Sequence, residues 1–390
     1  MQIKIPAAFM RGGTSRAVFF KEGDLAPYDR RIREFIVLAA LGSPDPYGRQ
    51  IDGLGGGISS LSKVAIIERG DASDTDVLFT FAQVDVERPI VDFMGTCGNI
   101  SAAVGAFAID EGMVPAVEPV TAVRVLATNT GKRYIAYIPV RHGQAETEGD
   151  YTIDGVPGPG ARIALEFLDP GGSLGGYVLP TGHAAETLIL ESGTHVTVSV
   201  VDAAAPMVFV RADDLGANAT DCPQALDAAR SLQELLEEIR SQAAVLLGLA
   251  ENVKYAREQV KAIPKIAMVA PPSQYRTTKA TLIGADQVDL VARMVSMGKT
   301  HRTFAGTSSM CLAVAAAVPG TVVNAVARQA MPERVRIGHP AGIVEVGAKV
   351  QPHGDDWRVE SVTTQRTARR IMDGVIYVPQ SYLQGKPWFT

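Results

Sequence analysis

The segment Gly95-Thr96-Cys97-Gly98-Asn99 places a thiol directly ahead of an alanine-rich run at 100–109. That run predicts a helix of small residues that ends near Gly112. The first turn of a helix has unpaired N–H groups and the positive end of the helix dipole. Carboxylates are stabilised there, and a cysteine forms its thiolate more readily there. The segment therefore offers an anion site and a candidate acid or base, although a free cysteine buried in a core gives the same pattern.

A similar segment occurs in the second half of the chain. Gly306-Thr307-Ser308 precedes Ser309-Met310-Cys311 and a run of Leu, Ala and Val at 312–317. Aligned with Gly95-Thr96-Cys97, this segment predicts a second helix that starts in the same way. Two such helices facing each other across a cleft would direct two sets of N–H donors at a small molecule with several carboxylates. One shared tripeptide is also compatible with chance, because small apolar helices are common in protein interiors.

Two glycine-rich loops carry further polar side chains. The loop at 10–16 contains two hydroxyls and two guanidinium groups, and it can bring backbone N–H groups close to an anion. A plain hairpin turn between two strands is the alternative. The loop at 51–62 leads through three serines to Lys63 and the next strand. Lys63 could be a general base if burial keeps its amine neutral, whereas a solvated lysine at a strand start would have no such role. The spacing of a phosphate-binding loop is absent.

The length of 390 residues predicts two domains. Strand-like segments of antiparallel character dominate, with one small-residue helix in each half, so the pattern indicates an α+β fold and not an alternating βα one. A glycine-rich run at 169–176 marks the crossover, and we expect domains at 1–184 and 185–390, with the last strand or strands free to return to the N-terminal half. Helical spacing predicts further helices at 28–41, 223–249 and 286–298.

Composition excludes several classes of protein. The net charge is -5, and no cluster of Lys and Arg is interleaved with aromatic residues, so nucleic-acid binding is not expected. The three cysteines and six histidines lack metal-ligand spacing, so no metal site is predicted. No G-x-G-x-x-G follows a strand, which argues against a nicotinamide or flavin cofactor. The N-terminal segment has no signal-peptide pattern and no apolar run approaches the roughly 20 residues that span a bilayer. These features favour a cytoplasmic protein without a membrane segment.

Several motifs, in order along nearly the whole chain, resemble one known family. The motifs are Met10-Arg11-Gly12-Gly13-Thr14-Ser15, Asp52-Gly53-Leu54-Gly55-Gly56, Ser62-Lys63-Val64-Ala65-Ile66-Ile67, Cys97-Gly98-Asn99-Ile100-Ser101, Pro180-Thr181-Gly182 and Gly338-His339-Pro340-Ala341-Gly342. Together they resemble the PrpF family of isomerases. The resemblance implies a diaminopimelate-epimerase-like fold of two pseudo-symmetric halves, each a mostly antiparallel sheet wrapped around a central helix. It also implies an active site in the cleft between the halves and no cofactor.

The family's catalytic pair carries over onto Lys63 and Cys97. Further residues expected to bind the substrate are Thr14, Ser15, Arg16, Ser60, Gly98, Asn99, Thr307, Ser308, Ser309, Met310 and His339. A structural role for His339 in its tight turn is an equal alternative. The chain departs from the family pattern at Arg16-Ala17, where Lys-Gly is usual, and at His183, where asparagine is common. Both departures bear on substrate choice and neither affects the proposed pair.

The family includes 2-methylaconitate isomerase, 3-methylitaconate Δ-isomerase and 4-oxalomesaconate tautomerase. The expected reaction therefore moves a double bond in a small unsaturated di- or tricarboxylate, by a 1,3-allylic proton shift or by cis–trans isomerisation, and methylitaconate-type members look most similar. A tautomerase of 4-oxalomesaconate is the alternative within the family. A non-catalytic protein that holds a tricarboxylate for an iron–sulfur dehydratase is an alternative of another class. An amino-acid racemase would need a second thiol where Ser308 stands. A homodimer through an exposed sheet edge is a further expectation.

Overall fold

The computed structural model describes residues 1–71, 73–328 and 334–389. The chain forms two compact units, one of Met1–Leu165 with Arg366–Thr390 and one of Glu166–Gln365. The expected boundary at 184 differs from the observed one at 165. Residues 166–184 belong to the second unit because their backbone is bonded there: the N–H groups of Val178 and Leu179 donate to the Asp356 carboxylate at 2.8 and 3.0 Å.

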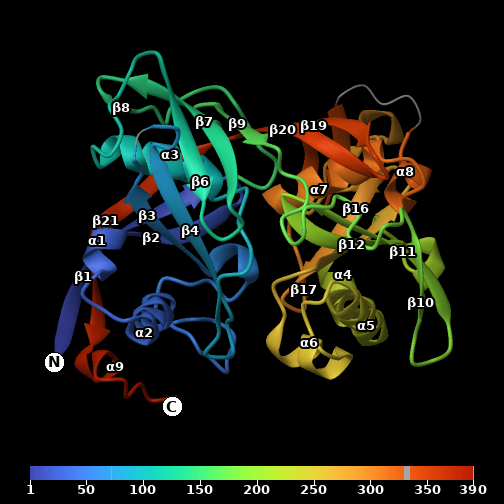
Figure 1. Cartoon of the computed structure of the whole chain (residues 1–390), viewed down its shortest axis with the longest axis horizontal. Coiled ribbons are helices and arrows are strands. Elements are labelled where there is room, and N and C mark those ends of the chain that lie inside the picture. The colour runs from blue at the N-terminus through green and yellow to red at the C-terminus, as the bar shows by residue number, and fades with distance from the viewer. Residues whose placement is uncertain (72, 329–333, 390) are drawn as a thin grey trace. The chain divides into compact units, whose positions relative to one another are not determined.

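The first unit is built on a mixed sheet with the strand order β21-β1-β2-β3-β4-β6-β7 (Figure 1). Its main strands are β1 (Gln2–Gly12), β2 (Ser15–Lys21), β3 (Lys63–Arg69), β4 (Val77–Val84), β6 (Val120–Ala127), β7 (Lys132–Arg141) and β21 (Ala368–Pro379). Neighbours are antiparallel except for β2 with β3 and β4 with β6, which are parallel. The short strands are β5 (Val91–Asp92), β8 (Gln144–Ala145) and β9 (Ile163–Leu168), which extends past the unit boundary.

The helix α3 (Ser101–Asp110) forms the centre of the first unit. Its residues from Ser101 to Ile109 are all buried, as expected for a helix that is apolar on every side. It contacts β1, β3, β4, β7 and β21, so the sheet wraps around it. The predicted helix at 28–41 is confirmed as α2 (Arg30–Leu41), which is capped by Asp29 and ends at Gly42 with φ of 71°. The other helices here are α1 (Glu22–Leu25), η1 (Ser59–Leu61) and α9 (Gln380–Leu383).

The second unit repeats this strand succession. Its main strands are β10 (Glu186–Ile189), β11 (His195–Ala203), β12 (Ala205–Arg211), β13 (Lys265–Ala270), β16 (Leu290–Ser296), β18 (Arg334–His339), β19 (Gly342–His353) and β20 (Asp356–Arg366). Here β12 with β13 and β16 with β18 are the parallel pairs, and the other neighbours are antiparallel. The series β11-β12-β13-β16-β18-β19 therefore matches β1-β2-β3-β4-β6-β7 in order and direction. The short strands are β14 (Tyr275–Arg276), β15 (Leu282–Ile283) and β17 (Lys299–Thr300).

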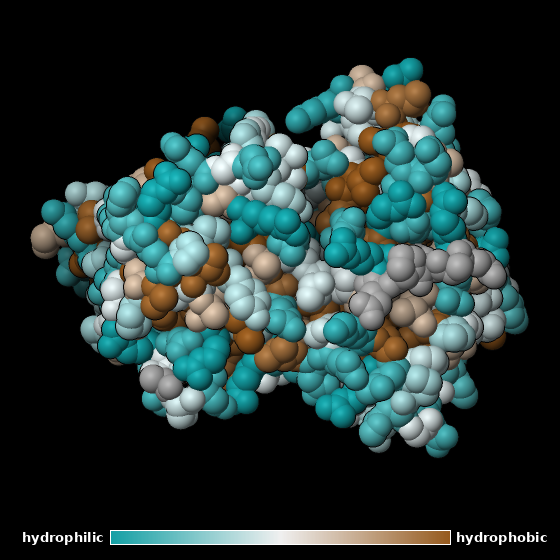
Figure 2. All heavy atoms as spheres, turned by 90° about the horizontal axis from the view of Figure 1, so that it is seen from above, coloured by the Kyte–Doolittle hydropathy of each residue, from teal (hydrophilic) through white to brown (hydrophobic). Residues whose placement is uncertain are grey.

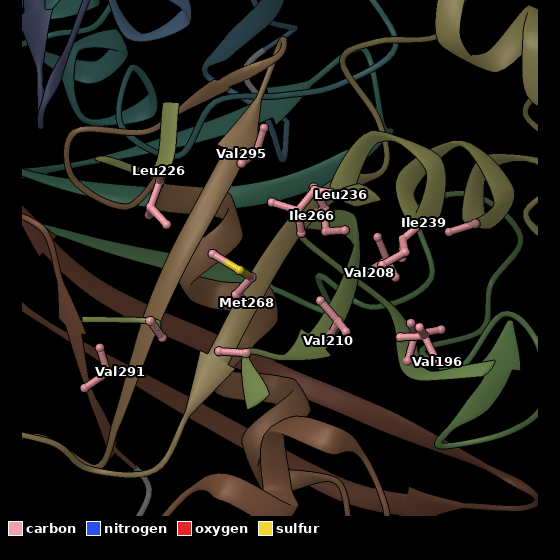
Figure 3. Close-up of a cluster of buried hydrophobic side chains, with 14 of the residues drawn as sticks. Val196, Val208, Val210, Leu226, Leu236, Ile239, Ile266, Met268, Val291 and Val295 are labelled. Carbon is pink, nitrogen blue, oxygen red and sulfur yellow. The ribbon is translucent and has the colours of Figure 1, made fainter. Parts of the chain in front are cut away.

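The helix α7 (Gly306–Ala317), buried from Gly306 to Ala316, is the central helix of this unit and contacts β11, β12, β18 and β19. The predicted helix at 223–249 is divided at Ala229 into α4 (Pro223–Ala228) and α5 (Arg230–Leu246). The apolar face of α5 packs on the valine-rich face of the sheet, as the side chains in Figure 3 show. The remaining helices are α6 (Val253–Gln259), α8 (Val322–Val326), η2 (Asp213–Leu215) and η3 (Ala285–Gln287).

The helix predicted at 286–298 is wrong, because residues 290–296 form the strand β16. All seven of its residues are buried. A fully buried strand has no polar face, so spacing alone cannot distinguish it from a buried helix. None of the helices in the described part of the chain is long and apolar enough to cross a bilayer. On the face drawn in Figure 2, hydrophilic side chains predominate and apolar ones lie scattered among them.

Candidate active site

Lys63 is the first residue of β3, and its side chain is buried against β4. The antiparallel register places it opposite Gln83. Its Nζ donates to Gln83 Oε1 at 2.5 Å and lies 5.1 Å from the centre of the Phe81 ring. Lys63 is only 7% exposed, so the solvated lysine considered from the sequence is excluded. A buried lysine amine is a common choice for a general base.

Cys97 lies at the N-terminal end of the central helix α3. Its carbonyl accepts the Ser101 N–H at 2.9 Å and the Ser101 hydroxyl at 3.0 Å, so the turn at 98–100 continues the helix backwards to the cysteine. The thiol is buried and not in a disulfide. Tyr134 donates to the Ser101 carbonyl at 3.2 Å, and burial raises its pKa so that the phenol stays protonated. Because α3 also contacts β3, Cys97 and Lys63 belong to elements that pack together in one unit.

Asn99 joins the helix start to the β1–β2 turn. Its Nδ2 donates to Thr14 Oγ1 at 3.0 Å and to Ser15 Oγ at 3.5 Å. Its Oδ1 accepts from Arg366 Nε at 3.1 Å. The approach is close enough that a Cβ on Gly12 would lie 2.5 Å from the Asn99 carbonyl oxygen. Glycine is therefore required in this turn, and it brings the two hydroxyls against the residues that follow Cys97.

The guanidinium of Arg366 is buried beneath this turn. Desolvation lowers its pKa to about 10, while Tyr151 and Cys97 act electrostatically in the opposite direction. At neutral pH the group remains a cation close to Cys97. Arg16 adds a second guanidinium, 5.3 Å from the Phe9 ring, whose buried Nε has no hydrogen-bond partner among the residues described. Arg366 thus places a cation at the start of α3, a setting that favours anions, and Arg16 and Lys63 are two further basic side chains of the same unit.

The first unit also has two buried candidate hydroxyls, on Thr96 and Ser60, and a buried glycine beside Cys97. Thr96 Oγ1 has no hydrogen-bond partner within the described ranges, as expected of a group that meets a ligand. Ser60 is buried in the short helix η1 ahead of Lys63. Gly98 is buried in the turn after Cys97, and the absence of a side chain there permits close approach of a neighbouring group. Thr96 and Gly98 therefore place an unpaired hydroxyl and a small residue on either side of Cys97 at the start of α3.

The candidate residues of the second unit lie in the first turn of α7 and at the end of β18. Thr307 Oγ1 and Ser308 Oγ are buried and unpaired within the described part of the chain, like Thr96 in the first unit. The Ser309 hydroxyl instead donates to the Gly306 carbonyl at 2.7 Å, and Met310 is fully buried. His339 Nδ1 accepts the Ala341 N–H at 3.2 Å, which supports the turn that follows.

The protein family of this chain follows from one comparison. The family described as PrpF protein matches residues 2–379. The chain belongs to the PrpF family. A 3-methylitaconate isomerase from Eubacterium barkeri is 44% identical over 98% of this chain and 99% of its own length. A 2-methyl-aconitate isomerase from Shewanella oneidensis is 38% identical over 97% and 98%. The crystal structure of a methylitaconate-delta-isomerase has a TM-score of 0.77 at 43% identity and covers 99% of this chain and 98% of that one.

This membership confirms the predicted α+β fold of two pseudo-symmetric halves. The sequence analysis of this PrpF protein did not predict a role for three residues near the candidate groups. Gln83 and Arg366 are brought to Lys63 and Asn99 only by strand pairing and by the return of the chain. Lys265 opens β13 as Lys63 opens β3, and it interacts electrostatically with Cys311. The similar segments Lys-Val-Ala-Ile and Lys-Ile-Ala-Met were the sequence signal for this last pair.

No group of three metal-ligating side chains occurs among the described residues. The candidate acids and bases of the site are the Lys63 amine, the Cys97 thiol and the surrounding cations. The Cys311 thiol differs from that of Cys97. Its sulfur donates to the Val201 carbonyl at 3.3 Å. Burial raises the pKa of Cys311, which makes it a structural group and not a reactive one.

Proposed function

We propose that this PrpF protein is an isomerase that moves a carbon–carbon double bond in a small unsaturated di- or tricarboxylate, of the methylitaconate or methylaconitate class. The observation that carries the proposal is the buried Lys63 amine in the same unit as the buried Cys97 thiol, with Arg366 bonded to Asn99 at the helix start. The names and high identity of the relatives support the substrate class.

In the proposed reaction, the neutral Lys63 amine removes a proton from a carbon next to the double bond. The electron pair of that C–H bond enters the conjugated system and is delocalised onto a carboxylate. Cys97 then delivers a proton to the far allylic carbon, which completes the shift of the double bond, and the proton on Lys63 returns to the thiolate through the site or solvent. A well-placed general base contributes about 10²–10⁴-fold to such a step.

The cations and helix N–H groups have a separate role in this proposal. The Arg16 and Arg366 guanidinium groups and the start of α3 stabilise substrate carboxylates and the negative charge that develops on proton removal. The unpaired hydroxyls of Thr96, Thr307 and Ser308 are proposed to donate hydrogen bonds to substrate carboxylates. The remaining proposed contacts are Thr14, Ser15, Ser60, Gly98, Asn99, Ser309, Met310 and His339.

Proton NMR in deuterium oxide tests the function directly. We expect the wild-type protein to shift the double bond of 3-methylitaconate or 2-methylaconitate and to introduce deuterium at the allylic carbons. Lys63→Ala and Cys97→Ala should each lower turnover by at least about 10²-fold while remaining folded. Lys254→Ala and Cys222→Ala, at exposed positions, are the matched controls. Near wild-type turnover in either site variant would show that its assigned role is wrong.

The same panel separates the other candidates. Turnover of 4-oxalomesaconate alone would assign the protein to the tautomerases of the family. Binding of tricarboxylates without deuterium exchange would indicate a non-catalytic accessory protein, and exchange at the α-carbon of an amino acid would indicate a racemase. The three free thiols support a reducing, cytoplasmic location, which we propose together with a homodimer. Cell fractionation and sedimentation test these two points.

A further inference from the structure

Gln83 is the group that fixes the Lys63 amine in position. Its amide nitrogen donates to the carbonyls of Ser59 at 3.1 Å and Ser62 at 2.9 Å. Both carbonyls can only accept, so the amide cannot be turned around, and Oε1 must be the atom that faces Lys63. That oxygen accepts from Nζ at 2.5 Å. The orientation of the acceptor is therefore set by the backbone on either side of η1.

We propose that Gln83 is the positioning residue of Lys63, because its amide holds the buried amine through a neutral acceptor that leaves the lysine able to gain and lose a proton. This inference rests on the proposed role of Lys63 as base. A carboxylate at the same place would pair with the ammonium and favour the charged form. An apolar side chain would remove the acceptor and leave the amine free to move. The uncharged Gln83 amide supplies an acceptor for the amine without adding a charge beside it.

The Lys63 amine also has neighbours other than Gln83. The Phe81 ring contacts Nζ on the same strand as Gln83 and does not titrate. The titratable or charged side chains on neighbouring elements include Asp92 on β5, which the register places opposite Gln83, Arg16 and Lys21 on β2, and Cys97 ahead of α3. On β3 itself, Glu68 and Arg69 lie at the opposite, exposed end of the strand. Gln83 contacts the amine directly, and a single substitution at this position converts the contact from neutral to charged.

Three variants test the inference. Gln83→Glu introduces a carboxylate without a change in length, and Gln83→Met removes the acceptor at similar length. Gln144→Glu adds the same charge at an exposed position of the first unit and is the control. The readout that does not depend on activity is an NMR titration of protein labelled at the lysine side chains, with the Lys63 signal assigned by Lys63→Met.

We expect Gln83→Glu to move the midpoint of the Lys63 titration upward by about 1 pH unit or more, since a close opposite charge favours the ammonium. Gln83→Met should move it downward, because the charged form loses an acceptor. The acidic limb of the kcat/KM profile should follow both shifts, with turnover at neutral pH reduced about 10-fold or more in Gln83→Glu and restored at higher pH. Gln144→Glu should leave the midpoint and the profile unchanged.

A purely structural role would lower thermal stability without moving the midpoint, and that result in both Gln83 variants would overturn the inference. If Gln83→Glu does not fold, Gln83→Met is a sufficient test. An unchanged midpoint of the Lys63 titration together with an unchanged kcat in Gln83→Met would overturn the inference. If the wild-type protein shifts no double bond, the proposed function fails, while opposite shifts of the Lys63 midpoint would still establish that Gln83 controls the proton on this amine.

Discussion

The contact between the β1–β2 turn and the start of α3 leads to a quantitative prediction for Gly12→Ala. The new methyl group would lie 2.5 Å from the Asn99 carbonyl oxygen, 3.0 Å from Ile100 Cα and 3.3 Å from Ala103 Cβ. Two of these atoms belong to the backbone and cannot rotate away, so the turn that carries Cys97 must move. Overpacking of this kind costs about 1–3 kcal/mol. For a domain of such a size this corresponds to a fall in melting temperature of about 2–12 °C.

Gly23→Ala is the matched control, because a Cβ at Gly23 meets no atom within 4 Å and the residue lies in the short helix α1. Its expected effect is a gain of up to about 0.5–1 kcal/mol, since alanine is favoured over glycine in helices. Both variants would be measured by thermal unfolding and by the initial rate of isomerisation. We expect Gly12→Ala to lose turnover by more than its stability loss explains. Wild-type stability and turnover in Gly12→Ala would refute the argument that this turn places the helix start.

Three further predictions concern other contacts. Asn99→Ala should cost about 1.5–3 kcal/mol in unfolding free energy, because the buried Arg366 loses a charged hydrogen bond; equal melting temperatures would contradict this. The hydrogen bond from Arg124 lowers the pKa of Asp76 below its ordinary 3.8, so this contact stabilises the fold above about pH 4 and is lost as the pH falls further. Wild type should therefore have a higher melting temperature than Asp76→Asn at pH 7, and the difference should shrink as the pH is lowered below 3.8. In the native protein iodoacetamide should modify exposed Cys222 well before buried Cys311, as peptide mass spectrometry would show.

Local sequence was sufficient to predict the groups that stand at the ends of elements. Cys97 precedes a run of small residues, and Lys63 follows a glycine loop at a strand start, so both could be placed without tertiary information. The β1–β2 hairpin and α2 were predictable for the same reason, since their signals are short-range. The identity of Lys63 and Cys97 as the catalytic pair came from family resemblance and remains a proposal.

The partners of these groups could not be predicted from the sequence. Gln83 meets Lys63 only through the register of β3 with β4, and a slip by one residue would turn it to the other face of the sheet. Arg366 is 267 residues from Asn99 along the chain, so no local pattern links them. The strand β16 was missed because burial on both faces removes the alternation that identifies strands.

The pairing of β1 with β21 determines when the sheet of the first unit can be completed during translation. The eleven residues of β1 emerge long before their antiparallel partner, residues 368–379. Residues 166–365 form a contiguous unit that can complete its own sheet during translation. Until residues 368–379 emerge, the first unit has one edge of its sheet unpaired, which makes it the part most in need of chaperone protection.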